Sequence, residues 1–317
     1  MTTTALTTSQ EVTPTIQRTN PLLSVMTWEL RRFSSNRIFW FQVLGFFCFL
    51  LLVQFIFNSE VANRAFSGSV AASSPWGLLQ QLPFGSLMLL CMLLPFVNAD
   101  GVTRDLTRRT HELLMTTAVP NWAYVWGRYL VSLLMSLGLA IVVLAAILVV
   151  GWIRHLADSG YPAPEIGVVL LLWVGMVIPA TALISSLSFA LGTIFPRQST
   201  LIKVILLLGW FFEASIIPVA LNLTYGQSLP PSWLSAWDPT SSISAFATLH
   251  QYQTAWMNQI GPTTGAAQAQ HIFITVENTV PNVSNWFVPH LFLAVLSLLL
   301  VALAALTFQR FRNVRAG

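Results

Sequence analysis

Six long apolar runs determine what this 317-residue chain can fold into. A helix that crosses the hydrocarbon core of a bilayer needs about 20 mostly apolar residues. The segments that qualify are residues 38–57, 77–99, 129–153, 166–195, 201–221 and 287–308. Only 8% of the residues are charged, against about 25% in a typical soluble domain. The sequence therefore predicts an all-α, polytopic membrane protein with six transmembrane helices. Because Pro179 interrupts the long fourth run, we expect that span to be kinked and tilted.

The distribution of lysine and arginine predicts the orientation of these spans. Thirteen of the 15 basic residues fall on one side, and only Arg64 and Arg154 fall on the other. Loops rich in lysine and arginine stay in the cytoplasm. We therefore expect a multi-pass protein of the plasma membrane with both termini in the cytoplasm. Outside the segments that flank the membrane there is no basic stripe, so nucleic-acid binding is not expected.

The segments before the first span and between the last two spans carry their own signals. Residues 1–19 are predicted to be a disordered cytoplasmic tail, and residues 20–317 the membrane domain. Asn20 and Pro21 favour the start of a helix over residues 20–32, which we expect to lie on the cytoplasmic membrane surface. That segment is alternatively the plain start of the first span. Residues 222–286 contain no lysine or arginine and several tryptophans, so part of this outer segment is expected either to pack on the bundle or to lie in the outer interface. A short helix is expected there after Asp238-Pro239.

The segment "RDLTRRTHELLMTTAVPNWAYVWGR" at residues 104–128 concentrates charge between the second and third runs. Leu106, Leu113 and Leu114 can form one apolar side of a helix, followed by a break at residues 118–121 and a second short turn. A rigid charged helix between two spans would let a docked partner move both spans. The alternative is a loop that only sets the topology.

The pattern of Asp105, Arg108, Thr110, Glu112-Leu113-Leu114 and Pro120, followed by Gly127-Arg128, resembles the permease subunit of ABC-2 type exporters. The surface helix, the six spans and the outer excursion match that family in layout, although Asp105 and Arg109 replace its usual Glu and Gly. The resemblance implies that residues 104–117 form a coupling helix inserted in a groove of an ATP-binding subunit. The expected coupling residues are Arg104, Asp105, Arg108, Arg109, Thr110, Glu112, Leu113 and Leu114.

The chain has no G-x-x-x-x-G-K-[ST] phosphate loop, so ATP has to be bound elsewhere. The chain also lacks a nucleophile motif, and its five histidines are not spaced as metal ligands. We therefore expect no catalytic site, metal or cofactor in this chain. The resemblance implies two ATP-binding subunits, which carry ATP and Mg²⁺. It also implies a second permease copy, expected to be a homodimer partner that pairs near the first and fifth spans.

Polar residues inside the apolar runs are candidates for the transport path. Glu213 is the only carboxylate within a predicted span, which makes it either a contact for cargo or cations or a protonated structural group. Thr181, Ser185 and Ser188 share one helix face, and Gln42 lies in the first span. Small hydroxyl residues also serve close helix packing, so both interpretations stay open for them.

The function expected is the permease half of an ATP-driven exporter that works by alternating access. Alternatives are a channel or secondary transporter, a membrane-embedded enzyme, or a membrane anchor or sensor that transmits force without transport. The apolar outer segment favours a hydrophobic or amphipathic cargo.

Overall fold

A computed structural model describes residues 20–56, 60–63, 68–71, 73–102, 119–157, 161–223, 229–261 and 264–308. Within these residues, six helical stretches are long and apolar enough to cross a membrane. They run over Arg37–Phe55, Pro75–Asn98, Asn121–Ala157, Ile166–Ile194, Pro196–Ala220 and Phe287–Thr307. Each overlaps one of the six predicted runs, so the prediction of an all-α polytopic membrane protein is confirmed. One small addition is an antiparallel hairpin of β1 (Glu60–Asn63) and β2 (Gly68–Ala71).

The first and third spans are each a single helix, α2 (Arg37–Ile56) and α7 (Asn121–Ala157). At 37 residues, α7 is about 55 Å long, well beyond the roughly 30 Å hydrocarbon core. The short turn predicted for residues 122–128, ahead of a span starting at residue 129, is not separate from that span, because residues 121–128 form the first two turns of α7. The break at Val119-Pro120 directly precedes the start of this helix at Asn121.

The second, fourth and fifth spans each contain a π-helical turn beside a proline. The second span joins α3 (Pro75–Gln81), η1 (Pro83–Leu87) and α4 (Met88–Asn98). The fourth joins α8 (Ile166–Leu172), η2 (Trp173–Val177) and α9 (Ile178–Ile194). The fifth joins η3 (Pro196–Gln198), α10 (Ser199–Phe211), η4 (Phe212–Ile216) and α11 (Ile217–Ala220).

In the fourth span, the irregularity predicted at Pro179 takes the form of this π-helical turn. Proline has no N–H, so the carbonyl of Gly175 four residues earlier loses its helical donor. His290, in the sixth span α15 (Phe287–Thr307), supplies a replacement because its Nδ1 lies 3.1 Å from that carbonyl oxygen.

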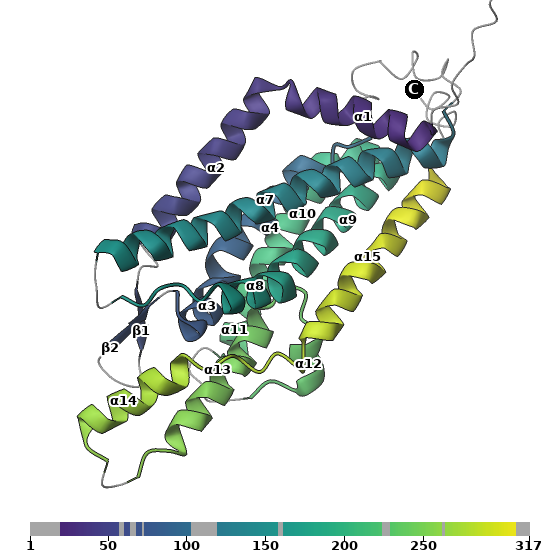
Figure 1. Cartoon of the computed structure of the whole chain (residues 1–317). Coiled ribbons are helices and arrows are strands. Elements are labelled where there is room, and N and C mark those ends of the chain that lie inside the picture. The colour runs from purple at the N-terminus through teal and green to yellow at the C-terminus, as the bar shows by residue number, and fades with distance from the viewer. Residues whose placement is uncertain are drawn as a thin grey trace, which may run out of the picture.

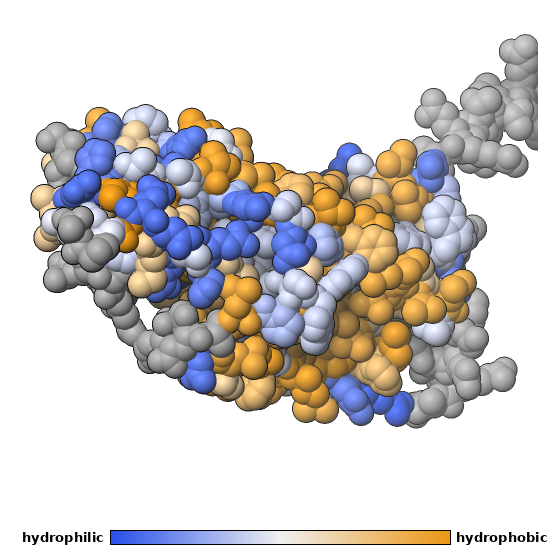
Figure 2. Space-filling model, turned by 90° about the horizontal axis from the view of Figure 1, so that it is seen from below, coloured by the Kyte–Doolittle hydropathy of each residue, from blue (hydrophilic) through white to orange (hydrophobic). Residues whose placement is uncertain are grey.

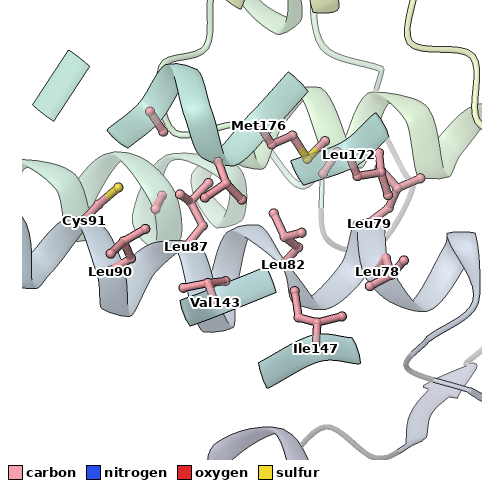
Figure 3. Close-up of a cluster of buried hydrophobic side chains, with 14 of the residues drawn as sticks. Leu78, Leu79, Leu82, Leu87, Leu90, Cys91, Val143, Ile147, Leu172 and Met176 are labelled. Carbon is pink, nitrogen blue, oxygen red and sulfur yellow. The ribbon is translucent and has the colours of Figure 1, made fainter. Parts of the chain in front are cut away.

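The hydrophobic core is built around the second span. Figure 3 shows Leu78, Leu82, Leu87 and Leu90 on one ribbon, with Val143 and Ile147 of α7 on one side and Leu172 and Met176 of the fourth span on the other. The second span is the most enclosed of the six, and α2 is the least enclosed. In Figure 1, α2 stands away from α7 at the end that carries α1 and approaches it at the other end.

Helix α1 (Pro21–Ser34) lies beside the start of α7, across one end of the bundle (Figure 1). As predicted, Asn20 caps it by accepting a hydrogen bond from the Leu22 N–H at 3.1 Å. The buried residues of α1 are Val25 and Glu29, however, and Leu23 is 58% exposed. The face of α1 that packs on the bundle therefore carries Val25 and Glu29, and Leu23 points away from it.

The opposite end carries α12 (Ser232–Ala236), α13 (Ser242–Met257) and α14 (Ala266–Glu277). Helix α13 begins after Asp238-Pro239, as the sequence predicts. Figure 2 views this end and shows hydrophilic residues gathered toward the side of α13 and α14. Trp76 at the start of the second span packs edge-on against Tyr252 of α13 and Phe273 of α14, with ring centroids 5.7 and 5.3 Å away.

Asp238 organises the start of α13. Its Oδ2 accepts the N–H groups of Ile243 at 2.6 Å and Ser244 at 3.2 Å, and its Oδ1 accepts the Thr240 N–H at 3.0 Å. Burial raises the pKa of Asp238, and its hydrogen bonds to Thr240 oppose that rise. This carboxyl therefore satisfies main-chain donors that the helix start would otherwise leave buried without partners.

Candidate functional site at the junction beside residues 103–118

The predicted coupling residues Arg104 to Leu114 lie outside the described residues. The structure describes the chain on both sides of them: α4 with the turn that follows it up to Val102, and the chain from Val119 into α7. Five polar side chains meet beside these two ends, together with the main chain of residues 99–101. We call this set the junction, made of Glu29, Asn98, Asp100, Arg128, Lys203 and the main chain of Ala99 to Gly101.

Asn98, the last residue of α4, joins the second span to the third and fourth. It is fully buried, and its Nδ2 lies 3.0 Å from Ser136 Oγ of α7 and 3.3 Å from Ser185 Oγ of α9. A buried amide with partners on two neighbouring helices fixes their relative position, because losing a partner would leave a desolvated polar group.

The next residues tie the same turn to the fourth and fifth spans. Asp100 pairs with Lys203 of α10, with 2.6 Å between Oδ2 and Nζ. The main chain of Ala99 approaches α9 so closely that a Cβ at Gly192 would lie 2.1 Å from the Ala99 carbonyl oxygen. Only glycine permits this approach.

Arg128 of α7 closes the junction on its third side. Its side chain is 1% exposed, and its guanidinium donates to the carbonyl oxygen of Gly101. Nη2 lies 3.9 Å from Glu29 Oε2 on α1. The guanidinium also lies over the rings of Tyr124 and Trp28, 4.7 and 5.6 Å from their centroids. Arginine suits this position because it combines ion pairing, fork-shaped hydrogen bonding and stacking on aromatic rings.

Glu29 completes the set from α1. Its side chain is 4% exposed and also pairs with Arg32, with 3.2 Å between Oε2 and Nη1. A buried carboxylate requires such partners, because an uncompensated charge would be strongly destabilising. The junction thus connects α1 and the second to fifth spans around the point where the chain leaves for residues 103–118.

Sequence reasoning identified Arg128 within the motif but missed Glu29, Asn98, Asp100 and the role of Lys203. One signal was available for Glu29. It is the only acidic residue between Glu11 and Glu60, and it lies three residues before Arg32 on a basic helix.

The residues predicted for the transport path lie on three separate elements. Thr181, Ser185 and Ser188 of α9 are fully buried within the chain, and Ser185 is the partner of Asn98. Glu213 lies half-buried on η4 and has no hydrogen-bond partner among the described residues. Gln42 is exposed on α2. One copy of the chain therefore does not bring the five together.

Two of the described histidines, His290 and His155, contact main-chain carbonyl oxygens. His290 contacts Gly175, and its Nε2 lies 3.2 Å from Ser244 Oγ, while His155 Nδ1 lies 2.7 Å from the Tyr161 carbonyl oxygen. Within the described residues, no three His, Cys, Asp or Glu side chains are grouped so that they could hold a metal ion.

Comparison with curated proteins found no match. A model of the family described as "ABC-2 family transporter protein" matches residues 73–308, which span the second to sixth spans and the junction apart from Glu29. Because this match covers most of the sequence, the chain belongs to the ABC-2 family of transporter proteins, as a membrane-embedded permease subunit.

Proposed function

We propose that this chain is the permease half of an ATP-driven exporter, with residues 104–117 as the coupling helix that docks on an ATP-binding subunit. The observation that carries the proposal is the junction. The residues on both sides of that segment are tied to the second, third, fourth and fifth spans through Asn98, Asp100 and Arg128. A force applied between residues 103 and 118 would therefore reach four spans at once.

The energy source belongs to the partner in this proposal. Family membership implies association with an ATP-binding subunit, and the sequence has no phosphate-binding loop of its own. We propose two ATP-binding subunits that hold ATP and Mg²⁺ and close on each other when ATP binds. Their closure would move the coupling helices of Arg104 to Thr117 and switch the permease between inward- and outward-open states.

A second permease copy is proposed to complete the path. Helix α2 and helix α10 carry exposed apolar side chains along their lengths, among them Phe41, Leu44, Ile205 and Leu208. Pairing of two copies through these faces would bring Gln42 of α2 and Glu213 of the fifth span toward a shared centre. Thr181, Ser185 and Ser188 would then act behind that surface, as packing residues that shape the path. The cargo proposed is hydrophobic or amphipathic, in keeping with these apolar faces.

Purification of the tagged chain from its native membrane tests the proposal. We expect an ATP-hydrolysing subunit to copurify in equal amount. We expect Glu112→Arg to insert into the membrane but either to lose the ATP-hydrolysing subunit during purification or to keep it without coupling ATP hydrolysis to transport. Arg31→Glu is the matched control, because it reverses an exposed charge of α1 at the same end of the molecule. Normal assembly and normal transport by Glu112→Arg would remove the role assigned to Glu112. Solute movement by the purified chain alone would instead favour a channel or secondary transporter, and coupled ATPase without any cargo would favour a force-transmitting anchor.

A further inference from the structure

We propose that the buried pair of Glu29 and Arg128 is a positioning link that carries movement of the coupling segment to the first span, α2, through α1. This inference rests on the proposed function, since it assigns a route for movement that begins at residues 103–118. Glu29 and Arg128 act through the helices that they join and touch no cargo in this scheme.

The first step is that α1 is fixed to the start of α7. Val25 packs so closely on Gly127 that a Cβ at residue 127 would lie 2.8 Å from Val25 Cγ1. Glu29, one turn further along α1, meets Arg128 in the same surface. Steric fit and charge pairing therefore occur side by side, and both residues of α1 are buried by this contact.

The second step is that Arg128 joins both ends of the coupling segment to α1. It belongs to the helix that follows residues 103–118, and it donates to the carbonyl of Gly101, which precedes them. Trp28 of α1 and Tyr124 of α7 both contact the guanidinium with their rings. A displacement of either end of the segment would thus displace the partner of Glu29.

The third step is that the connection between α1 and α2 is short and braced. Only Ser35 and Asn36 separate the two helices. The Trp40 indole N–H donates to the Ser34 carbonyl oxygen at 2.9 Å, and the rings of Phe33 and Phe39 lie edge-to-face with centroids 5.5 Å apart. Because this turn has side-chain contacts on both sides, movement of α1 reaches α2 instead of being absorbed by the turn.

The fourth step is that α2 is held at its far end. Arg154 of α7 donates to the Phe55 carbonyl oxygen at 2.8 Å and lies over the Phe55 ring at 4.1 Å. Gln54 donates to Ser86 Oγ at 2.5 Å. Toward α1, in contrast, α2 stands away from α7 (Figure 1). A helix anchored at one end and driven at the other would pivot, and residues near the driven end, Gln42 among them, would move farther than Gln54.

Distances between spin labels on α2 and α7 test this route. Ile38→Cys and Leu134→Cys place labels on exposed positions of the two helices, with Cys48→Ser and Cys91→Ala removing the native thiols. The complex with its ATP-binding subunit is placed in lipid nanodiscs, with one labelled permease copy per complex. The label distance is compared between the nucleotide-free state and the state trapped with ADP and vanadate.

We expect the trapped state to shift the label distance in the wild-type background and Glu29→Gln to remove most of that shift while ATP hydrolysis continues. Arg32→Gln is the matched control, because it removes the other partner of Glu29 within α1 and should retain the full shift. The exchange Glu29→Arg with Arg128→Glu should restore part of the shift, since it re-forms the pair but not the bond to Gly101. The thermal midpoint of each variant is measured as well. A variant that loses the shift but keeps its midpoint has lost the link between α1 and α7, whereas a variant with a much lower midpoint has lost its fold.

A full shift in Glu29→Gln, or an equal loss in Arg32→Gln, would overturn the inference while leaving the proposed function intact. Absence of any ATP-hydrolysing partner in the wild-type preparation would overturn the proposed function, and this route with it. The two failures are therefore read from different measurements.

Discussion

The contact between Gly192 of α9 and the main chain of Ala99 allows a quantitative prediction. A Cβ at residue 192 would lie 2.1 Å from the Ala99 carbonyl oxygen, so α9 and the end of the second span would have to separate by roughly 1 Å to admit an alanine. Overpacking of this kind costs about 1–3 kcal/mol, which corresponds to roughly 2–5 °C in the thermal midpoint of a protein of this size. We expect Gly192→Ala to lower the midpoint by that amount.

Cys91 provides the assay, because its thiol is fully buried and reacts with a fluorogenic dye only when the bundle opens. The exposed Cys48 is replaced by serine in all variants. Gly138→Ala in α7 is the matched control, since a Cβ there meets nothing within 4 Å. Alanine should leave that midpoint unchanged or raise it, because alanine favours helix over glycine. Equal midpoints for the two variants would refute the close approach of Ala99 to α9.

Three further predictions concern the end that carries α13. Asp238→Ala should cost about 1–3 kcal/mol for each main-chain N–H left without a partner, and hydrogen exchange in the first turn of α13 should accelerate; unchanged exchange would contradict its capping role. Burial raises the pKa of Tyr252 to about 12, and its hydroxyl donates a hydrogen bond to the Thr279 carbonyl oxygen, an acceptor that favours the protonated form. Because the folded state holds the hydroxyl proton of Tyr252 more tightly than the unfolded state, this contribution to stability is full below about pH 10 and should be lost as the pH rises toward about 12. Unfolding followed by tryptophan fluorescence should show a smaller loss of stability at alkaline pH in Tyr252→Phe than in the wild type. His290→Leu should lower the stability of the bundle by about 1–3 kcal/mol, because it leaves the Gly175 carbonyl without this donor. The reaction of Cys91 with the dye should then show a lower thermal midpoint, and an unchanged midpoint would contradict the bond.

The spans could be predicted from the sequence because the thickness of the bilayer sets the length of an apolar helix. Within those spans, Pro179 indicated where the fourth would be irregular but not how its freed carbonyl would be satisfied. The donor, His290, lies 115 residues away from Gly175, and a single sequence carries no signal for a pairing at that distance.

The ends of helices were harder to predict than their existence. Residues 121–128 contain Gly127, which resembles a helix breaker in sequence but is a packing position in α7. Its missing side chain makes room for Val25 of α1. The meaning of this glycine depends on a contact with a segment about 100 residues earlier, so local sequence rules could not assign it.

The junction was predicted only in part. The motif located Arg128 and the segment beside it, because their spacing is local. The partners Glu29, Asn98 and Lys203 come from three other elements, and what unites them is burial next to one turn of the chain. Burial of a charge is a property of the folded bundle, and the sequence offered only the isolated acidic residue in α1 as a hint.

The most direct test of the central claim is a density map of the assembly purified from native membranes through a tag on this chain. The account predicts two ATP-binding subunits beneath two permease copies, with residues 104–117 seated in a groove of each ATP-binding subunit. A map of an active assembly in which that segment touches no nucleotide-hydrolysing subunit would contradict it.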